Sequence, residues 1–273
     1  MQAYRLTHMP ELLPMATTYL SFLEHAYNDD NGRFRNFMSY DRQWQEEFGS
    51  EDSHGRALWS LGIAVADAPT TGLRASAVDL FERAVGSAED LTALRAWAFA
   101  LIGIHGYLRR YSGDSDARRI RENLANRLFD QFKAHASDAW PWPESKLTYA
   151  NAKLPHALLM SGQWMDRADM IEVGLRSLKW LLEVQTESDG TLSPVGNDGW
   201  YPRHGKPASF DQQPIEIYTL LEACIEAHNI TRDKYWHVQA RRCFDWFLGK
   251  NQLNKTLYDY ETGGCHDGLQ PNG

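Results

Sequence analysis

The sequence has few cysteines and no excess of positive charge. Cys224, Cys243 and Cys265 lie far apart in a chain of 273 residues, a spacing that suggests neither a disulfide framework nor a zinc site. We therefore expect free, buried thiols in a reducing cytoplasm, with no metal and no cofactor. The net charge of −8, without a basic stripe to neutralise phosphates, argues against a nucleic-acid partner.

Long apolar runs are also missing. No uncharged apolar stretch approaches the roughly 20 residues of a membrane span, so we expect no membrane partner. The N-terminus has no apolar region, which predicts that there is no secretion signal. The composition is that of a globular protein, 43% hydrophobic and 23% charged, with a surplus of ten Trp and twelve Tyr. The core explains most of these rings, and a planar ligand such as a carbohydrate could use the rest.

Strand patterns are nearly absent, whereas helical periodicity predicts nine helices. They cover about residues 10–27, 55–68, 73–85, 93–111, 116–135, 151–161, 167–185, 214–228 and 233–248. The second, fourth, sixth and eighth are apolar on several faces, and the third, fifth, seventh and ninth carry charge on one side. An inner ring and an outer ring of helices would produce this alternation.

A repeated pattern favours a closed ring over an open helical array. An amphipathic helix ends, passes through a polar turn and enters a long loop at residues 19–34, at 178–192 and, more weakly, at 243–259. Helical hairpins that close on themselves form an all-α, (α/α)6-type toroid, in which these loops meet where the inner helices begin. Because six hairpins need twelve helices, we expect one toroid domain over residues 1–273, incomplete at one or both ends or built from fewer hairpins.

The longest loop, residues 193–216, carries the first candidate site. Long loops within compact domains are usually functional. This loop combines acids for glycosidic chemistry, amides for hydroxyl groups, and aromatic rings that could stack on sugars. Asp211 is the leading catalytic candidate, and its alternative role is to cap the following helix.

Two further carboxylates are catalytic candidates. Asp52 has His54 and Arg56 as neighbours, and its alternative role is also capping, since Asp52 or Ser53 could accept hydrogen bonds from free N–H groups at a helix start. Glu144 follows Trp-Pro-Trp-Pro, and apolar neighbours would raise its pKa as a general acid requires. An ion pair with Arg or Lys is the alternative for Glu144.

The remaining candidates would bind substrate, the rings by stacking and the polar groups through hydroxyls. They are Trp140, Trp142, Trp200, Tyr201, Asn151, Asn197, Asp198, Arg203, His204, Gln212, Gln213, His54, Arg56, His266 and Asp267. Arg203 and His204 could hold an acidic sugar or phosphate, whereas Asp198 and Asp267 lie in sequences typical of turns. Glu216 is expected to make a structural pair with a basic or aromatic group. Trp59, Trp97, Trp180 and Trp246 occur at helical spacing and are assigned to the core.

Several segments also resemble a known family. They are residues 49–59 (GSEDSHGRALW), 142–144 (WPE), 147–155 (LTYANAKLP), 210–216 (FDQQPIE) and 263–268 (GGCHDG). Together they resemble the helical toroid domain that follows the glycosyltransferase domain in a group of bacterial proteins, and at the level of the fold the six-hairpin glycosidases. The resemblance implies an (α/α)6 barrel, a carbohydrate-related role, and covalent or non-covalent association with a glycosyltransferase domain. Ala150 stands where an Asp is common in that family, and Pro143 where an aromatic residue is common.

Three functions remain compatible with these patterns. The first is glycoside processing, preferably hydrolysis by two carboxylates, with an oligosaccharide or glycoside as the ligand. Carboxylates about 5–5.5 Å apart would retain the anomeric configuration, and about 6.5–9.5 Å apart would invert it. The second is a non-catalytic sugar-binding or scaffold module that accompanies a glycosyltransferase. The third is a terpenoid-cyclase-like toroid, but residues 28–31 read as a helix-ending turn rather than as a metal-binding motif.

Overall fold

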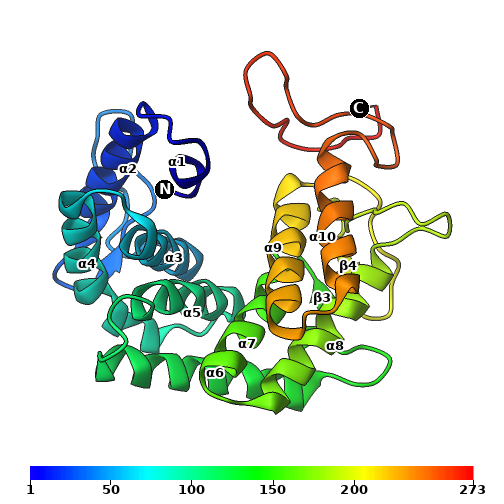
Figure 1. The fold of residues 1–273 in the computed structure, drawn as a ribbon, viewed down its shortest axis with the longest axis horizontal. Helices are drawn as coiled ribbons and strands as arrows, with labels where there is room; N and C mark the ends of the chain where they lie inside the picture. The colour runs from blue at the N-terminus through cyan, green and yellow to red at the C-terminus, as the bar shows by residue number, and fades with distance from the viewer. Residues whose placement is uncertain (273) are drawn as a thin grey trace. The chain divides into compact units, whose positions relative to one another are not determined.

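The computed structural model describes residues 1–272, apart from the side chain of Gln2. Ten α-helices hold nearly all the regular structure of these residues, together with one 3-10 helix and two short two-stranded sheets (Figure 1). The chain packs as two compact units, residues 1–128 and 129–273. That the two form a single domain remains a prediction.

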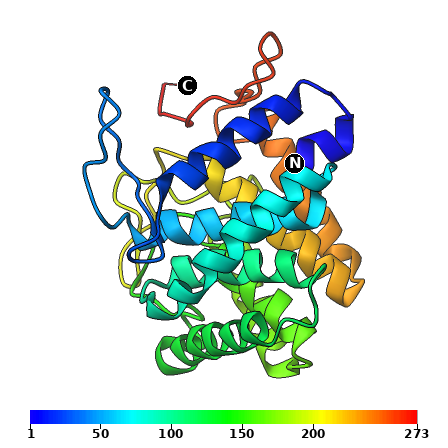
Figure 2. The ribbon, with the colours of Figure 1, turned by 90° about the vertical axis from the view of Figure 1, so that its left-hand side faces the viewer.

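The first unit is organised on two apolar helices, α3 and α5. Its elements are α1 (Gln2–Thr7), α2 (Leu12–Ala26), β1 (Tyr27–Asn28), β2 (Arg33–Phe34), α3 (Glu51–Asp67), α4 (Thr71–Val85), η1 (Gly86–Asp90) and α5 (Leu94–Leu108), followed by α6 (Ser115–His135). β1 and β2 are antiparallel, with Tyr27 opposite Phe34. Residues 35–48 form a narrow projecting loop, at the left of Figure 2, whose two sides meet at a bridge between Met38 and Trp44.

Glycines let α3 and α5 approach until their backbones touch. A Cβ atom added at Gly62 would lie 2.0 Å from the carbonyl oxygen of Gly103, and one added at Gly103 would lie 2.3 Å from that of Leu58. α5 is buried along almost its whole length, while α4 packs on α3 and leaves its charged side exposed. Within this unit, α3 and α5 are therefore the inner helices that the sequence alternation predicts.

The second unit repeats the arrangement. Its elements are β3 (Lys146–Leu147), α7 (Lys153–Trp164), α8 (Ala168–Val184), β4 (Tyr201–Pro202), α9 (Pro214–Thr231) and α10 (Lys234–Phe247). α7 packs against both α8 and α9, and α9 packs against α10 (Figure 1). α7 is almost completely buried, while α8 and α10 bury one face each. Here α7 and α9 are the inner helices.

All nine predicted helices are present, and α1 is an additional short helix. The predicted second helix begins about four residues too late, which also changes its cap. Ser50 is the N-cap of α3, and its Oγ accepts a hydrogen bond from the Ser53 N–H at 3.0 Å. The prediction that Asp52 or Ser53 caps this helix is therefore wrong.

Two further expectations concern the state of the cysteines and the presence of membrane-spanning helices. All three cysteines are free, but Cys265 is exposed, contrary to the expectation of buried thiols, because it lies in the loop after α10. Within residues 1–272, no helix combines the length and the apolarity that a membrane crossing needs.

Candidate functional site

Three loops of the second unit come together where α7 and α9 begin. β3, in the loop after α6, pairs antiparallel with β4, in the loop after α8, and Leu147 lies opposite Tyr201. The loop after α10 joins them, because the backbone N–H groups of Gln212 and Leu269 each donate to the other's carbonyl, at 3.1 and 2.8 Å. The loops that carry Glu144, Asp211 and Asp267 are therefore tied together.

Asp211 does not cap α9. Gln213 occupies the N-cap position, and its side chain makes no capping hydrogen bond. The Asp211 Oδ1 atom is buried without a hydrogen-bond partner, and no described residue forms a hydrogen bond or ion pair with this carboxylate. Buried polar atoms are nearly always paired, so each exception needs an explanation, such as a ligand-binding or catalytic role. The capping alternative is thus wrong.

Close backbone contacts hold Asp211 in place. A Cβ atom at Gly268 would lie 2.4 Å from Asp211 Oδ1, and one at Gly196 would lie 2.1 Å from the carbonyl oxygen of Phe210. The Asp211 carbonyl also accepts a hydrogen bond from the N–H of Asn197 at 2.8 Å. Gly268 therefore allows the loop after α10, and Gly196 another part of the Asp211 loop itself, to contact the residue pair that carries the carboxylate.

Asn151 and Glu216 fix the loop before α7. Asn151 is fully buried, and its Nδ2 donates to Glu216 Oε2 at 2.8 Å and to the Thr148 carbonyl at 2.7 Å. The Ala150 N–H donates to the other Glu216 oxygen. These contacts give Asn151 a structural role in place of the predicted substrate contact. Glu216 is structural as predicted, and it accepts hydrogen bonds from the amides of Ala150 and Asn151.

Gln212 is also buried, and its amide binds neighbouring loops. Its Nε2 donates to Gln252 Oε1 at 2.7 Å, to the Ser209 carbonyl at 2.9 Å and to Ser193 Oγ at 3.3 Å. Gln212 Oε1 is buried and has no partner. The predicted contact of this amide with substrate is replaced by contacts that join three loop segments.

Two of the predicted stacking rings are buried. Trp142 is 0% and Trp140 4% exposed, and Trp140 packs edge-on against Trp180 and Tyr201. Neither ring offers an open face, contrary to the prediction, because the Trp-Pro-Trp-Pro segment turns into the unit rather than outward. Trp200 and Tyr201 are half-buried, and they remain candidates for stacking.

Two other charged side chains of these loops, Glu144 and Arg203, form hydrogen bonds within the protein. Glu144 Oε2 lies 3.3 Å from the Trp142 indole N–H, which donates to it. The guanidinium of Arg203 donates hydrogen bonds to the His135 carbonyl and to Ser137 Oγ, at 3.3 and 2.9 Å. These contacts connect the loop of Arg203 to the end of α6 and give the side chain a structural role in place of the predicted anion contact. His204 is exposed.

Asp198 and Asp267 lie in exposed turns, as their sequences suggest. The Asp198 N–H donates to the Phe210 carbonyl at 3.2 Å. The N–H of His266, the residue before Asp267, donates to the Leu257 carbonyl at 2.8 Å. Both acids are open to solvent, in contrast to Asp211.

The predicted group at the start of α3 belongs to the first unit and is also engaged. Asp52 pairs with Arg56 at 2.6 Å, and the Arg56 guanidinium lies 4.4 Å from the centre of the Phe99 ring. His54 is fully buried, with Nε2 3.0 Å from Ser87 Oγ. Burial, reinforced by the charge of Arg33, lowers the pKa of His54 to about 3, so this side chain is neutral in the folded protein.

A buried lysine was not predicted from the sequence. The Lys153 side chain, 0% exposed, forms an ion pair with Glu222, whose Oε1 accepts from the Tyr218 hydroxyl at 2.8 Å. Burial and the charge of Glu222 raise the pKa of Tyr218. The sequence could have predicted this ion pair, because Lys153 stands in the apolar segment with which α7 begins. A lysine is almost never fully buried unless it is paired.

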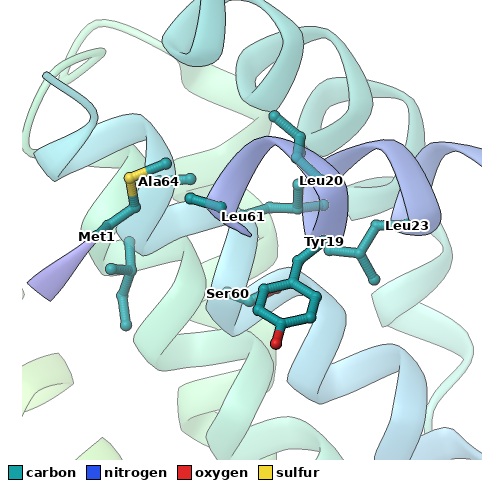
Figure 3. A pocket seen from close by; sticks show the side chains of 9 residues that line it. Met1, Tyr19, Leu20, Leu23, Ser60, Leu61 and Ala64 are labelled. Atoms are coloured by element: carbon teal, nitrogen blue, oxygen red, sulfur yellow. The ribbon is translucent and has the colours of Figure 1, made fainter. Parts of the chain in front are cut away.

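A pocket of the first unit is mainly apolar, unlike the joined loops of the second unit. It has a volume of about 240 Å³ and lies between α2 and α3 (Figure 3), where Leu20 and Leu23 face Leu61 and Ala64. Apart from the hydroxyls of Tyr19 and Ser60, the labelled side chains are apolar, so this pocket lacks the acids of glycosidic chemistry. Among residues 1–272, no group of three or more His, Cys, Asp or Glu side chains could hold a metal ion.

Comparison with known proteins identifies the fold. No protein-family model matches the chain, and no curated protein matches it. Among solved structures, an unsaturated glucuronyl hydrolase specific for heparin aligns with 85% of this chain and 65% of its own, at 15% identity and a TM-score of 0.63. D-mannose isomerase aligns with 97% of this chain and 76% of its own, at 14% identity and a TM-score of 0.65.

A third similar structure contains a saccharide. An inactive variant of an α-1,6-mannanase from Salegentibacter sp. HEL1_6, in complex with α-1,6-mannotetrose, aligns with 85% of this chain and 68% of its own, at 15% identity and a TM-score of 0.57. These structures share the six-hairpin glycosidase-like fold. The fold class of the chain is thus all-α, of the (α/α)6 toroid type. At such low identity the similarity establishes the fold alone.

Proposed function

We propose that the chain binds an oligosaccharide at the joined loops of the second unit and hydrolyses a glycosidic bond there with Asp211. The unpaired carboxylate of Asp211 is the observation that carries this proposal. A buried acid without a hydrogen-bond partner indicates a functional site, because the substrate can supply the missing partner. The fold, which is shared with carbohydrate-processing proteins, supports the same substrate class.

Hydrolysis needs two carboxyl groups with different roles. Asp211 would act as the nucleophile or as the base that activates water, and Glu144 would donate a proton to the leaving oxygen. The loops that carry these two acids are joined through the β3–β4 pair. Trp200 and Tyr201, both half-buried on the Asp211 loop, would stack on sugar rings. Association with a glycosyltransferase domain and a cytoplasmic location remain predictions of the sequence.

The test is a pair of matched substitutions in one loop. Asp211→Asn keeps the shape of the side chain but removes its charge, so we expect turnover of a cleavable glycoside to fall by roughly 100-fold or more, with saccharide binding and helical circular dichroism retained. Asp198→Asn makes the same chemical change in an exposed turn and should leave turnover near that of the wild type.

A panel of α-mannosides and α-glucosides, assayed for both cleavage and binding, provides the substrates. Binding without cleavage by the wild type would instead favour a sugar-binding module. If no member of the panel binds, or if Asp211→Asn turns over normally, the proposal is overturned.

A further inference from the structure

A polar pocket of the second unit is lined in part by Phe210, the residue before Asp211. It has a volume of about 580 Å³, and the side chains that line it include those of Glu187, Asp189, Ser209, Phe210, Asn251 and Gln252. Ligand pockets commonly measure roughly 300–1,000 Å³. Phe210 lines this pocket and directly precedes Asp211, so the pocket and the carboxylate of the proposed site belong to consecutive residues of one loop.

One amide of this lining, that of Gln252, is held in one orientation by two hydrogen bonds. Gln252 Nε2 donates to Glu187 Oε1 at 2.8 Å, and its Oε1 accepts from the buried Gln212 at 2.7 Å. One hydrogen of Gln252 Nε2 and one lone pair of its Oε1 remain for a ligand. This orientation is therefore fixed in part by Gln212, the residue that follows Asp211.

The charge of the pocket restricts what can bind. Glu187 and Asp189 are its only ionisable residues, and no Lys, Arg or His is among the residues that line it. The Asp189 carboxylate accepts the N–H of Thr191 at 2.8 Å, and this hydrogen bond, the largest effect on the group, lowers the pKa of Asp189. Within this lining, the two carboxylates would repel an acidic sugar and would accept hydrogen bonds from the hydroxyl groups of a neutral one. The cations Arg241, Arg242 and Lys250 line an adjoining pocket that also includes Asp189.

We infer that this pocket is a subsite for an additional neutral pyranose unit of the oligosaccharide that Asp211 acts on. The inference rests on the proposed function and adds a substrate class to it. Uncharged oligosaccharides longer than a disaccharide are preferred, and uronate-containing chains are disfavoured at this position. Amides and acids bind the hydroxyls, and Phe210 supplies an apolar face.

Calorimetric titration of the hydrolysis-blocked Asp211→Asn protein tests the subsite. The probes are α-1,6-mannobiose and mannotetraose, isomaltose and isomaltotetraose, and di- and tetragalacturonate. We expect a neutral tetrasaccharide to bind about tenfold more tightly than its disaccharide, which corresponds to about 1.4 kcal/mol, and the uronate pair to show no such gain. Adding Gln252→Ala should abolish the gain without weakening disaccharide binding. Adding Gln239→Ala, which removes an amide bonded to Arg242 on α10, should preserve it.

The possible results separate the two proposals. Three results overturn the subsite but leave the proposed function standing. They are disaccharide binding with no gain in affinity for the tetrasaccharide, a gain in affinity that survives Gln252→Ala, and an equal gain for the uronates. If no saccharide of either length binds to the wild type or to Asp211→Asn, both are overturned.

Discussion

The backbone at residue 268 approaches Asp211 so closely that a side chain there would displace the carboxylate. A Cβ atom at this position would lie 2.4 Å from Asp211 Oδ1. We therefore expect Gly268→Ala to reduce glycoside turnover by roughly 100-fold, the cost of a small misplacement of a catalytic group, with the thermal midpoint almost unchanged. Gly264→Ala, in the same loop, would meet only the Thr262 hydroxyl, at 3.2 Å, and serves as the control. Normal turnover of both variants would show that the Gly268 contact does not position Asp211.

The sequence placed its candidate acids on loops that the fold joins, but it could not assign each side chain within them. Asp211 was a candidate because of its position before a helix, yet only the fold shows that Gln213 takes the cap and leaves the acid unpaired. Trp142 and Asn151 look like ligand-binding residues in the sequence, but both are fully buried. Their burial depends on partners distant in the sequence, such as Glu216, which no local pattern specifies.

Close contact between α3 and α5 is the feature of the first unit most sensitive to a single methyl group. A Cβ atom at Gly103 would lie 2.3 Å from the carbonyl oxygen of Leu58 in the facing helix. Both sides of this contact are helical backbone and cannot yield locally, so we expect Gly103→Ala to lower the free energy of unfolding by about 2 kcal/mol or more. Urea titration followed by circular dichroism measures the change.

A second glycine on the neighbouring helix provides the control for that prediction. Gly72, in the first turn of α4, has no heavy atom within 4 Å of an added Cβ. Gly72→Ala should therefore be neutral or stabilise the protein by up to about 1 kcal/mol, since alanine favours helix. Equal destabilisation by both substitutions would contradict the role assigned to the Gly103 contact.

Helices were the most predictable elements, because their apolar periodicity is local and strong. The inner and outer alternation, too, followed from composition, since an inner helix such as α5 must be apolar on nearly every side. The short α1 and the two-residue strands escaped prediction. Such elements carry too few residues for a periodic signal, and β3 and β4 exist only because their loops meet.

The acid sensitivity of the folded chain depends on histidines that burial keeps neutral. Burial, with the charge of Arg33, lowers the pKa of His54 to about 3. Burial, with Arg109 and Arg121, lowers the pKa of His105 to about 4. In the unfolded chain both would titrate near 6.5, so below that pH the unfolded state binds more protons and folding is penalised. The stability that these two neutral histidines contribute is therefore fully present above about pH 6.5 and is lost progressively as the pH falls toward their lowered pKa values.

We predict that the free energy of unfolding falls between pH 6.5 and pH 4 with a slope that approaches about 1.4 kcal/mol per pH unit for each of these histidines. Replacing His54 by Gln removes one titrating group, so His54→Gln should show a shallower slope than the wild type whatever its stability at pH 7. Urea unfolding at half-unit pH steps measures both slopes. His204→Gln, the same replacement at an exposed position, is the control. A slope that is the same in His54→Gln and in the wild type would mean that other groups govern the response to acid.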